Sequence, residues 1–220
     1  DSFFLVHNET STGVTSRDLK EMAGLCRKEG ILVVVDAISD LCGEEIENDD
    51  WGVNVCFTAS QKCLAAPPGL SLISVDEGAW RRVEERKAES RSFYFDLARF
   101  RKYHERSEIP FTPSVPLFYA LSEALKLLRE EGYEARVERH RTCGQALYSA
   151  LDALGLEAYP MDARHRSNTV LVLKVPGGID NGRLRGYMKE KHGVVISDGM
   201  GKLRGLTFRI GCMGMISRRE

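Results

Sequence analysis

Apolar runs and a helix-like stripe alternate along the first 75 residues of the chain. Short apolar runs predict strands at 3–6 (FFLV), 31–36 (ILVVVD), 53–59 (VNVCFTA) and 70–75 (LSLISV). Continuous runs such as ILVVV are typical of parallel strands that are buried on both faces. Residues 16–29 carry apolar side chains at helical spacing, with Ser16 as the expected N-cap and Gly30 just beyond the end. This order of elements predicts an α/β region with a mostly parallel sheet.

The pattern changes in the second half of the chain. Residues 79–107 are charged and predict partial helix with an aromatic interruption at SFYFD, and three prolines within 110–116 predict an extended joint. Two long helices are expected, at 117–132 and at about 134–154. The remaining expected elements are strands at 169–176, 193–197 and 206–211 and a helix near 181–191. This alternation suggests a smaller α+β domain at the C-terminal end.

Charge and hydropathy exclude several classes of function. The chain holds 31 basic and 32 acidic residues, so there is no electrostatic footprint for nucleic acid or an anionic membrane. No apolar run reaches the ~18 residues of a membrane helix, and the N-terminal residues lack the basic start and cleavage site of a signal peptide. We therefore expect a cytoplasmic protein. The basic cluster of Arg136, Arg139, His140 and Arg141 is expected to be a solvated helix face.

The cysteines are typical of residues packed in a core and not of a reactive or metal-binding site. There are six, none forms a C-x-x-C pair, and their spacing matches no zinc site. Most lie among apolar or small residues, as buried thiols do. We expect reduced structural cysteines and no bound metal.

Two residues at successive strand ends are the first candidates for chemistry. Asp36 follows ILVVV, which places it at the carboxyl edge of a buried strand, where open α/β sheets bind ligands. Lys62 follows the next strand among small or uncharged neighbours. Taken alone, Asp36 fits a helix cap or a salt bridge, and Lys62 fits an ordinary surface lysine. Together they suit pyridoxal phosphate (PLP), because the lysine forms the Schiff base and the aspartate keeps the pyridine nitrogen protonated.

Two further segments add polar groups. HNETSTGV (7–14) supplies hydroxyls and an amide at the same predicted edge, although a helix-capping loop is an alternative. Arg209 lies within the apolar strand LTFRIG and must find an anion there. A guanidinium binds a carboxylate through two parallel hydrogen bonds, so either a substrate carboxylate or an internal salt bridge satisfies it.

These segments together resemble the class V aminotransferases of PLP fold type I, in the serine–pyruvate and alanine–glyoxylate branch. The matching segments are HNETSTGV (7–14), VVDAISDLCG (34–43), DDWGVNVCFTASQKCLAAPPGLSLISV (49–75), PFTPSVPLFYAL (110–121) and FRIGCMG (208–214). The block S-Q-K-x-L-x-x-P-P-G is the most specific of them. The resemblance implies an α/β fold, with part of a mainly parallel large-domain sheet at 1–120 and a small C-terminal α+β domain at 121–220.

The resemblance also implies a role for individual residues. Lys62 is expected to form the Schiff base with pyridoxal 5'-phosphate and to move a proton between Cα and C4′. Asp36 is expected to pair with the pyridine nitrogen, Thr10 to lie near the ring hydroxyl and Gln61 to reach the phosphate. Thr112 is expected to reach the phosphate of a neighbouring subunit, because the family's sites lie at the interface of a homodimer.

The implied function is transamination, with two alternatives left open. Arg209 is expected to bind the α-carboxylate of a small amino acid, of alanine, serine or aspartate type, which exchanges its amino group with a 2-oxo acid such as pyruvate or glyoxylate. The family's N-terminal phosphate loop and ring-stacking aromatic are not found in these residues, so a non-catalytic or partner-dependent fragment is an alternative. A cysteine desulfurase is disfavoured, because Gln61 stands where those enzymes have histidine.

Overall fold

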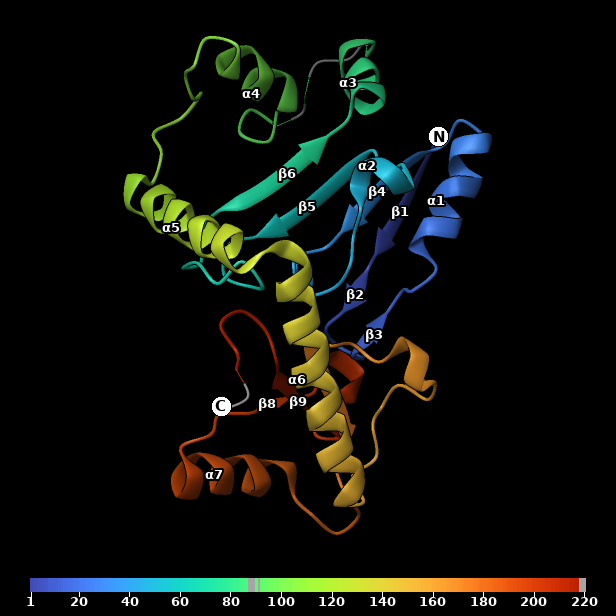
Figure 1. Ribbon diagram of the computed structural model, residues 1–220, viewed down its shortest axis with the longest axis vertical. Coiled ribbons are helices and arrows are strands. Elements are labelled where there is room, and N and C mark those ends of the chain that lie inside the picture. Colours follow the sequence, from blue (N-terminus) through green and yellow to red (C-terminus); the bar gives the residue numbers. More distant parts are fainter. Residues whose placement is uncertain (87–89, 91, 218–220) are drawn as a thin grey trace.

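The computed structural model describes residues 1–86, 90 and 92–217 and shows a four-stranded and a three-stranded sheet joined by two long helices, with a two-stranded hairpin beside them (Figure 1). The strands are β1 (Ser2–Val6), β2 (Asn8–Glu9), β3 (Val14–Thr15), β4 (Leu32–Asp36), β5 (Val55–Ala59), β6 (Ser71–Val75), β7 (Val170–Lys174), β8 (Ser197–Asp198) and β9 (Thr207–Gly211). The helices are α1 (Leu19–Lys28), α2 (Asn48–Trp51), α3 (Glu77–Glu84), α4 (Leu97–His104), α5 (Val115–Glu131), α6 (Tyr133–Ala153) and α7 (Asn181–His192). Short 3₁₀ helices occupy Ala163–His165 and Gly201–Leu203.

The larger sheet has the strand order β1-β4-β5-β6. The first three strands are parallel, and Val6, Asp36 and Phe57 lie opposite one another in adjacent strands. The expected mainly parallel sheet is therefore confirmed. The exception is β6, which runs antiparallel to β5. Residues 60–70 link these two strands without a helix, and a parallel pairing needs a crossover of a dozen residues or more.

Helix α1 covers one face of this sheet. Its buried Leu19 and Ala23 pack with Val33 and Val35 of β4 and Cys56 of β5. The helix begins at Leu19 and not at Ser16, so the predicted N-cap was wrong. Asp18 takes the N-cap position, and its side chain makes no capping hydrogen bond. Since the buried stripe starts only at Leu19, packing against the sheet sets the start of the helix.

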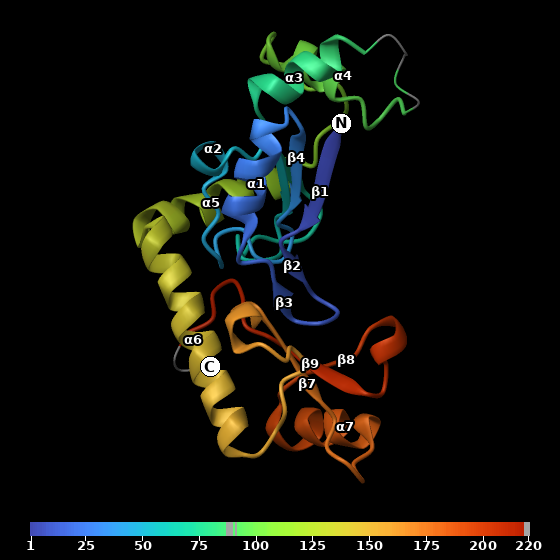
Figure 2. The same ribbon diagram turned by 90° about the vertical axis from the view of Figure 1, so that its right-hand side faces the viewer.

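The opposite face of the larger sheet is open. Phe4 is 72% exposed, Ile73 49% and Val6 45%. Val6, Asp36, Phe57 and Ile73 form one row across the four strands, so Asp36 points to this same face. Figure 2 shows α1 and α2 on one side of the sheet, and no helix of the described residues covers the other. Both edge strands, β1 and β6, also lack a neighbour within the described chain.

Helices α5 and α6 lead from the larger sheet to the smaller one, whose strand order is β7-β9-β8. Leu121 and Ala124 of α5 pack with Cys63 and Leu64, which follow β5. The domain boundary expected between residues 120 and 121 falls inside α5, and the division into two domains stays a prediction.

The strand expected at 193–197 was wrong in extent. Within residues 193–198, only Ser197 and Asp198 pair with β9. Gly193, at φ +67°, and Val194 instead donate their N–H groups to the last carbonyls of α7, Lys189 O and Met188 O. Residues that close a helix in this way are not free to join a sheet ladder.

Candidate active site

Asp36 is the last residue of β4, between the parallel strands β1 and β5. Its carboxylate accepts one hydrogen bond, from the N–H of Ile38 at 2.9 Å. It forms no ion pair with the described residues. The buried salt bridge of this segment is made by Asp40, which contacts His7. Of the two alternatives for Asp36, the internal salt bridge is therefore not found.

Lys62 lies three residues beyond β5, in a tight turn at 60–66. Within this turn the N–H of Ala65 donates to Lys62 O, and the N–H of Ala66 donates to Ser60 O, both at 2.9 Å. Ala65 adopts a left-handed conformation with φ 60°. The Lys62 side chain is half-buried, and its Nζ has no hydrogen-bond or ion-pair partner in the described part of the chain.

The Lys62 turn is packed onto the segment that follows Asp36. The Cys63 thiol lies 3.5 Å from Ser39 O, and the Thr58 hydroxyl donates to Ala37 O at 3.0 Å. Because the carboxyl ends of parallel strands meet at one edge of a sheet, this packing places both candidate residues on the same edge.

Thr10 lies in the connection between β2 and β3. Its side chain is half-buried, and its hydroxyl makes no hydrogen bond to the described residues. The hairpin contacts the segment that leads into β7, because Ser167 N–H donates to Gly13 O at 2.9 Å. Gly13 has φ +71°, and a Cβ there would lie 2.8 Å from Cγ2 of Val172. Only glycine fits this close approach.

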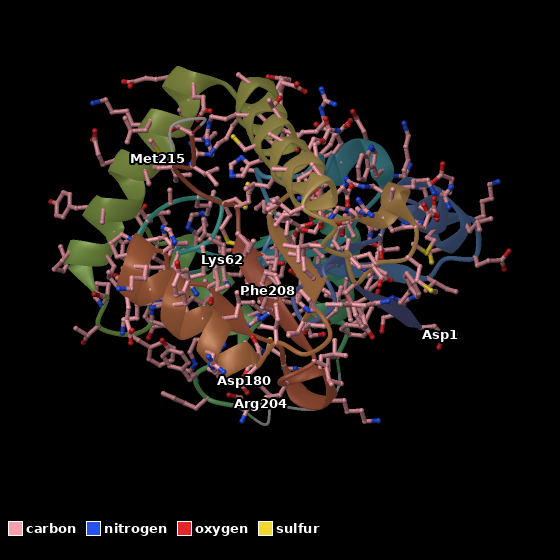
Figure 3. All side chains as sticks on the ribbon, turned by 90° about the horizontal axis from the view of Figure 1, so that it is seen from below. Asp1, Lys62, Asp180, Arg204, Phe208 and Met215 are labelled. Atoms are coloured by element: carbon pink, nitrogen blue, oxygen red, sulfur yellow. The ribbon has the colours of Figure 1, made fainter. Side chains whose placement is uncertain are left out.

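Arg209 lies in β9, the central strand of the smaller sheet. Its Nε donates to Asp198 O at 2.8 Å, and its Nη1 lies 3.1 Å from Met200 Sδ. No carboxylate pairs with it among the described residues, so the internal salt bridge weighed above is not found here either. In the view from below, Lys62 and Phe208, the neighbour of Arg209, project onto the same central region (Figure 3).

The segment after β9 connects Arg209 to the Lys62 turn. The N–H of Cys212 donates to Thr169 O at 2.8 Å. A Cβ added at Gly214 would lie 3.4 Å from Lys62 O and 3.5 Å from Cβ of Ala65, so the two backbones are in close contact. The structure thus brings Asp36, Lys62 and the strand of Arg209 to one region.

Gln61 and Thr112 are less constrained. Gln61 is exposed beside Lys62. Thr112 is exposed between α4 and α5, and its hydroxyl forms no hydrogen bond within the described chain. Next to it, Phe111 stacks on Tyr94 with ring centroids 4.7 Å apart and meets Phe93 at 5.6 Å. The expected reach of Thr112 to a neighbouring subunit stays a prediction.

The basic cluster on α6 is not a solvated face, and that prediction was wrong. Arg136 is 1% exposed and His140 0%, whereas Arg141 is exposed. The buried face of α6 continues through Cys143, Gly144 and Tyr148. The spacing 136, 140, 143/144, 148 follows one side of a helix and could have revealed a buried face. It was missed because half of that face is polar.

All six cysteines are free thiols. Burial raises the pKa of Cys42 and Cys56 to about 11 and that of Cys212 to about 12, and it raises the pKa of Cys63 well above its usual value. A raised pKa lowers the fraction of reactive thiolate at neutral pH. None of these four thiols suits a nucleophile.

We predict that these four cysteines react slowly with Ellman's reagent at pH 8. A rise in pKa from 9 to about 11 lowers the thiolate fraction about a hundred-fold, and reactivity should increase as the pH approaches 11. Cys26, only partly buried on α1, serves as the internal control and should react first. Fast labelling of all six in the folded chain would contradict the described burial.

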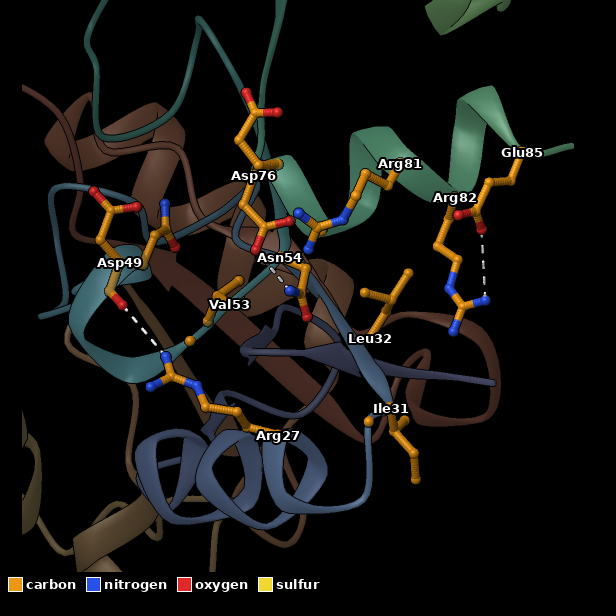
Figure 4. Close-up of a pocket in the computed structure, with 15 residues that line it drawn as sticks. Arg27, Ile31, Leu32, Asp49, Val53, Asn54, Asp76, Arg81, Arg82 and Glu85 are labelled. Atoms are coloured by element: carbon orange, nitrogen blue, oxygen red, sulfur yellow. Dashed lines mark hydrogen bonds and ion pairs between the residues drawn. The ribbon is translucent and has the colours of Figure 1, made fainter.

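A hollow of about 830 Å³ lies at the end of the larger sheet where β4 begins, away from the carboxyl ends of the parallel strands (Figure 4). It is lined by Leu32, the first residue of β4, and by Arg27, Asn54 and Arg81. Asp36 is at the other end of the same strand, so this hollow is separate from the candidate site. Among the described residues, no group of three His, Cys, Asp or Glu could hold a metal ion, and no helix is long and apolar enough to span a membrane.

Comparison with known proteins assigns the chain to a family. The family model for aminotransferase class-V matches residues 2–214. An uncharacterized aminotransferase of Methanocaldococcus jannaschii is 42% identical, over 98% of this chain and 56% of that protein. The alanine–glyoxylate aminotransferase of Drosophila melanogaster is 36% identical, over 96% of this chain and 55% of that protein.

A solved structure agrees with these relatives. The alanine–glyoxylate aminotransferase of Nostoc sp. superposes with a TM-score of 0.92 at 32% identity, covering 99% of this chain and 58% of that one. The chain therefore spans little more than half the length of the proteins that it matches. The match nevertheless includes both strand ends and the strand of Arg209, and it shows that this chain belongs to the class-V aminotransferases.

Proposed function

We propose that this chain forms part of a PLP-dependent transaminase that moves an amino group between a small amino acid and a 2-oxo acid. The observation that carries the proposal is the meeting of Asp36 and Lys62 at one sheet edge, each without an ionic partner among the described residues. Two of the relatives above are named for alanine and glyoxylate, which favours alanine as donor and glyoxylate as acceptor.

The residues present fit the cofactor. A carboxylate that keeps one oxygen free of protein hydrogen bonds, as Asp36 does, can accept a hydrogen bond from a pyridine N–H. An unpaired, half-buried amine such as Lys62 Nζ can hold the cofactor covalently. Thr10 would lie near the ring hydroxyl, and Gln61 and a neighbouring subunit's Thr112 would hold the phosphate. When bound, PLP supplies an electron sink for the bond broken at Cα of the amino acid.

The protein's own groups would bind the substrate and move its proton. Arg209 would hold the substrate α-carboxylate, because its guanidinium donates only one hydrogen bond to backbone, to Asp198 O, and keeps donors free. Lys62 Nζ would take the proton from Cα of the amino acid and deliver it to C4′ of the cofactor. Asp36 would keep the pyridine nitrogen protonated, which keeps the ring electron-deficient.

The open face of the larger sheet supports a partner surface next to Asp36. Asp36 points to the face that exposes Phe4, Val6 and Ile73, and a water-exposed apolar row is typical of a surface that is covered in the working protein. We propose that this cover corresponds to the part of the relatives that the chain does not match. A homodimer that brings Thr112 to a neighbouring site also remains a proposal, as does a cytoplasmic location.

A cysteine desulfurase is not favoured. Such an enzyme needs a mobile thiolate, whereas Cys42, Cys56, Cys63 and Cys212 are buried with raised pKa values. Release of sulfide from free cysteine would test this alternative directly.

Replacing Arg209 by glutamine tests the substrate site. The half-reaction with L-alanine is followed by the change in the visible absorption of the PLP-loaded protein. We expect Arg209→Gln to raise the half-maximal alanine concentration about ten- to a hundred-fold, because charged hydrogen bonds to the carboxylate are lost. Arg183→Gln, an exposed arginine of α7, should leave it unchanged. An unaltered alanine response in Arg209→Gln would contradict the proposed role.

A further inference from the structure

A buried arginine holds the turn that carries Lys62. Arg136, in the first turn of α6, is 1% exposed. Its Nε and Nη2 donate to the carbonyl oxygen of Cys63 at 3.2 and 2.9 Å. A buried guanidinium is costly unless its donors and its charge are matched. The matching acceptor here is the peptide oxygen of the residue directly after Lys62.

An acidic residue completes this arrangement. Nη1 of Arg136 donates to Oε2 of Glu131 at 2.8 Å. Arg139 approaches the same carboxylate, with Nε 2.5 Å from Oε1 and Nη2 3.1 Å from Oε2. These hydrogen bonds hold the pKa of Glu131 below its usual range, and the bond from Arg139 has the largest effect. The carboxylate therefore stays charged and links the two arginines.

The same stretch of α6 holds the chain that follows the strand of Arg209. Nη2 of Arg139 donates to Gly214 O at 3.2 Å, and Nη1 donates to Ile216 O at 2.5 Å. Nε2 of the buried His140 accepts the N–H of Gly214 at 3.0 Å. Two neighbouring turns of one helix thus bind both the Lys62 turn and residues 214–216.

We propose that Arg136 is a positioning residue for Lys62. Because Glu131 joins it to Arg139, the network fixes the Lys62 turn relative to residues 214–216 and hence to the strand that carries the substrate arginine. A long, flexible lysine side chain reaches a defined atom only when its backbone is held in place. The inference rests on the proposed function for the role of Lys62, but the hold on the turn does not depend on it.

Hydrogen exchange in the 220-residue chain tests the hold without cofactor. The amides of Ala65 and Ala66 close the turn, since they donate to Lys62 O and Ser60 O. We expect Arg136→Met to speed their exchange about ten-fold, because two hydrogen bonds from a charged donor are lost. Arg136→Lys, which keeps the charge and one donor, should recover part of the protection.

The experiment has a matched control variant and an internal reference strand. Arg141→Met makes the same substitution five residues further along α6, where the side chain is 49% exposed and paired with Glu138. It should leave the turn unchanged. The amides of Leu171 and Leu173, two fully buried residues of β7 that pair with Ile210 and Phe208 of β9, report on the fold as a whole and should exchange at the same rate in all variants.

A second measurement uses the cofactor. The PLP concentration that gives half-maximal borohydride-fixed label on Lys62 should rise about ten-fold in Arg136→Met and stay unchanged in Arg141→Met. If the unsubstituted chain takes no label at Lys62, the proposed function fails, and the exchange experiment still decides the positioning role.

Two results would overturn the proposal. One is unchanged exchange at Ala65 and Ala66 in a folded Arg136→Met chain. The other is an equal acceleration in β7, which would mean that Arg136 supports the fold in general and not this turn. If the methionine variant does not fold, Arg136→Lys decides by the same comparison of the turn with β7.

Discussion

Replacing Lys62 by alanine is expected to abolish borohydride-dependent labelling by PLP and to lower amino transfer from alanine to glyoxylate at least about a thousand-fold. The expectation follows from the place of this side chain, three residues beyond β5 and on the same sheet edge as Asp36. Its Nζ has no competing partner among the described residues. Loss of this amine removes both the covalent hold on the cofactor and the group that moves the proton.

A control separates this loss from a general effect of removing a lysine. Lys20→Ala changes an exposed lysine of α1 and should leave labelling and activity unchanged. Both variants should unfold at the same denaturant concentration as the unsubstituted chain, because neither side chain has a partner in the described structure. Full transaminase activity in Lys62→Ala would refute the proposed function.

Replacing Glu44 by alanine is expected to lower the free energy of unfolding by about 2–4 kcal/mol, less than for a fully buried ion pair because the Arg17 side chain is 30% exposed. Glu44 is 1% exposed and accepts hydrogen bonds from Nη1 of Arg17 at 2.5 Å and from the backbone and side-chain amides of Asn168 at 2.9 and 2.8 Å. It therefore ties the segment after β4 to the segment before β7. Without the carboxylate, Nη1 of Arg17 and the backbone and side-chain amides of Asn168 lose their acceptor at this junction.

Urea unfolding followed by circular dichroism measures this effect. Glu45→Ala removes an exposed carboxylate one position further along and should change the free energy of unfolding by less than about 0.5 kcal/mol. Equal unfolding midpoints for the two variants would show that Glu44 does not connect the two parts of the chain in solution.

Much of the fold, and the sheet edge that carries the candidate site, could be predicted from the local pattern of apolar residues. The run ILVVV followed by Asp36 predicted β4, and its place between β1 and β5 follows from parallel strand order. Lys62 could be placed on the same edge because it follows the next strand. These inferences need only the period of apolar residues and the rule that parallel strands share an edge.

Other features depend on contacts between distant segments. The buried face of α6 escaped prediction because hydrophobic periodicity counts only apolar residues, whereas this face contains Arg136 and His140. The acceptor that makes such burial possible, Cys63 O, lies 73 positions away from Arg136. Likewise the contact of Gly214 with the Lys62 turn arises only when both sheets are in place. The strand expected at 193–197 failed for a local reason, since Gly193 and Val194 close α7.

The most direct test of the account is to map where PLP attaches to the 220-residue chain. The purified chain is incubated with PLP, reduced with borohydride and digested, and the labelled peptides are identified by mass spectrometry. The account predicts one dominant labelled peptide, which contains Lys62, and the loss of this label in Lys62→Ala. Label spread over exposed lysines such as Lys20, with no preference for Lys62, would contradict it.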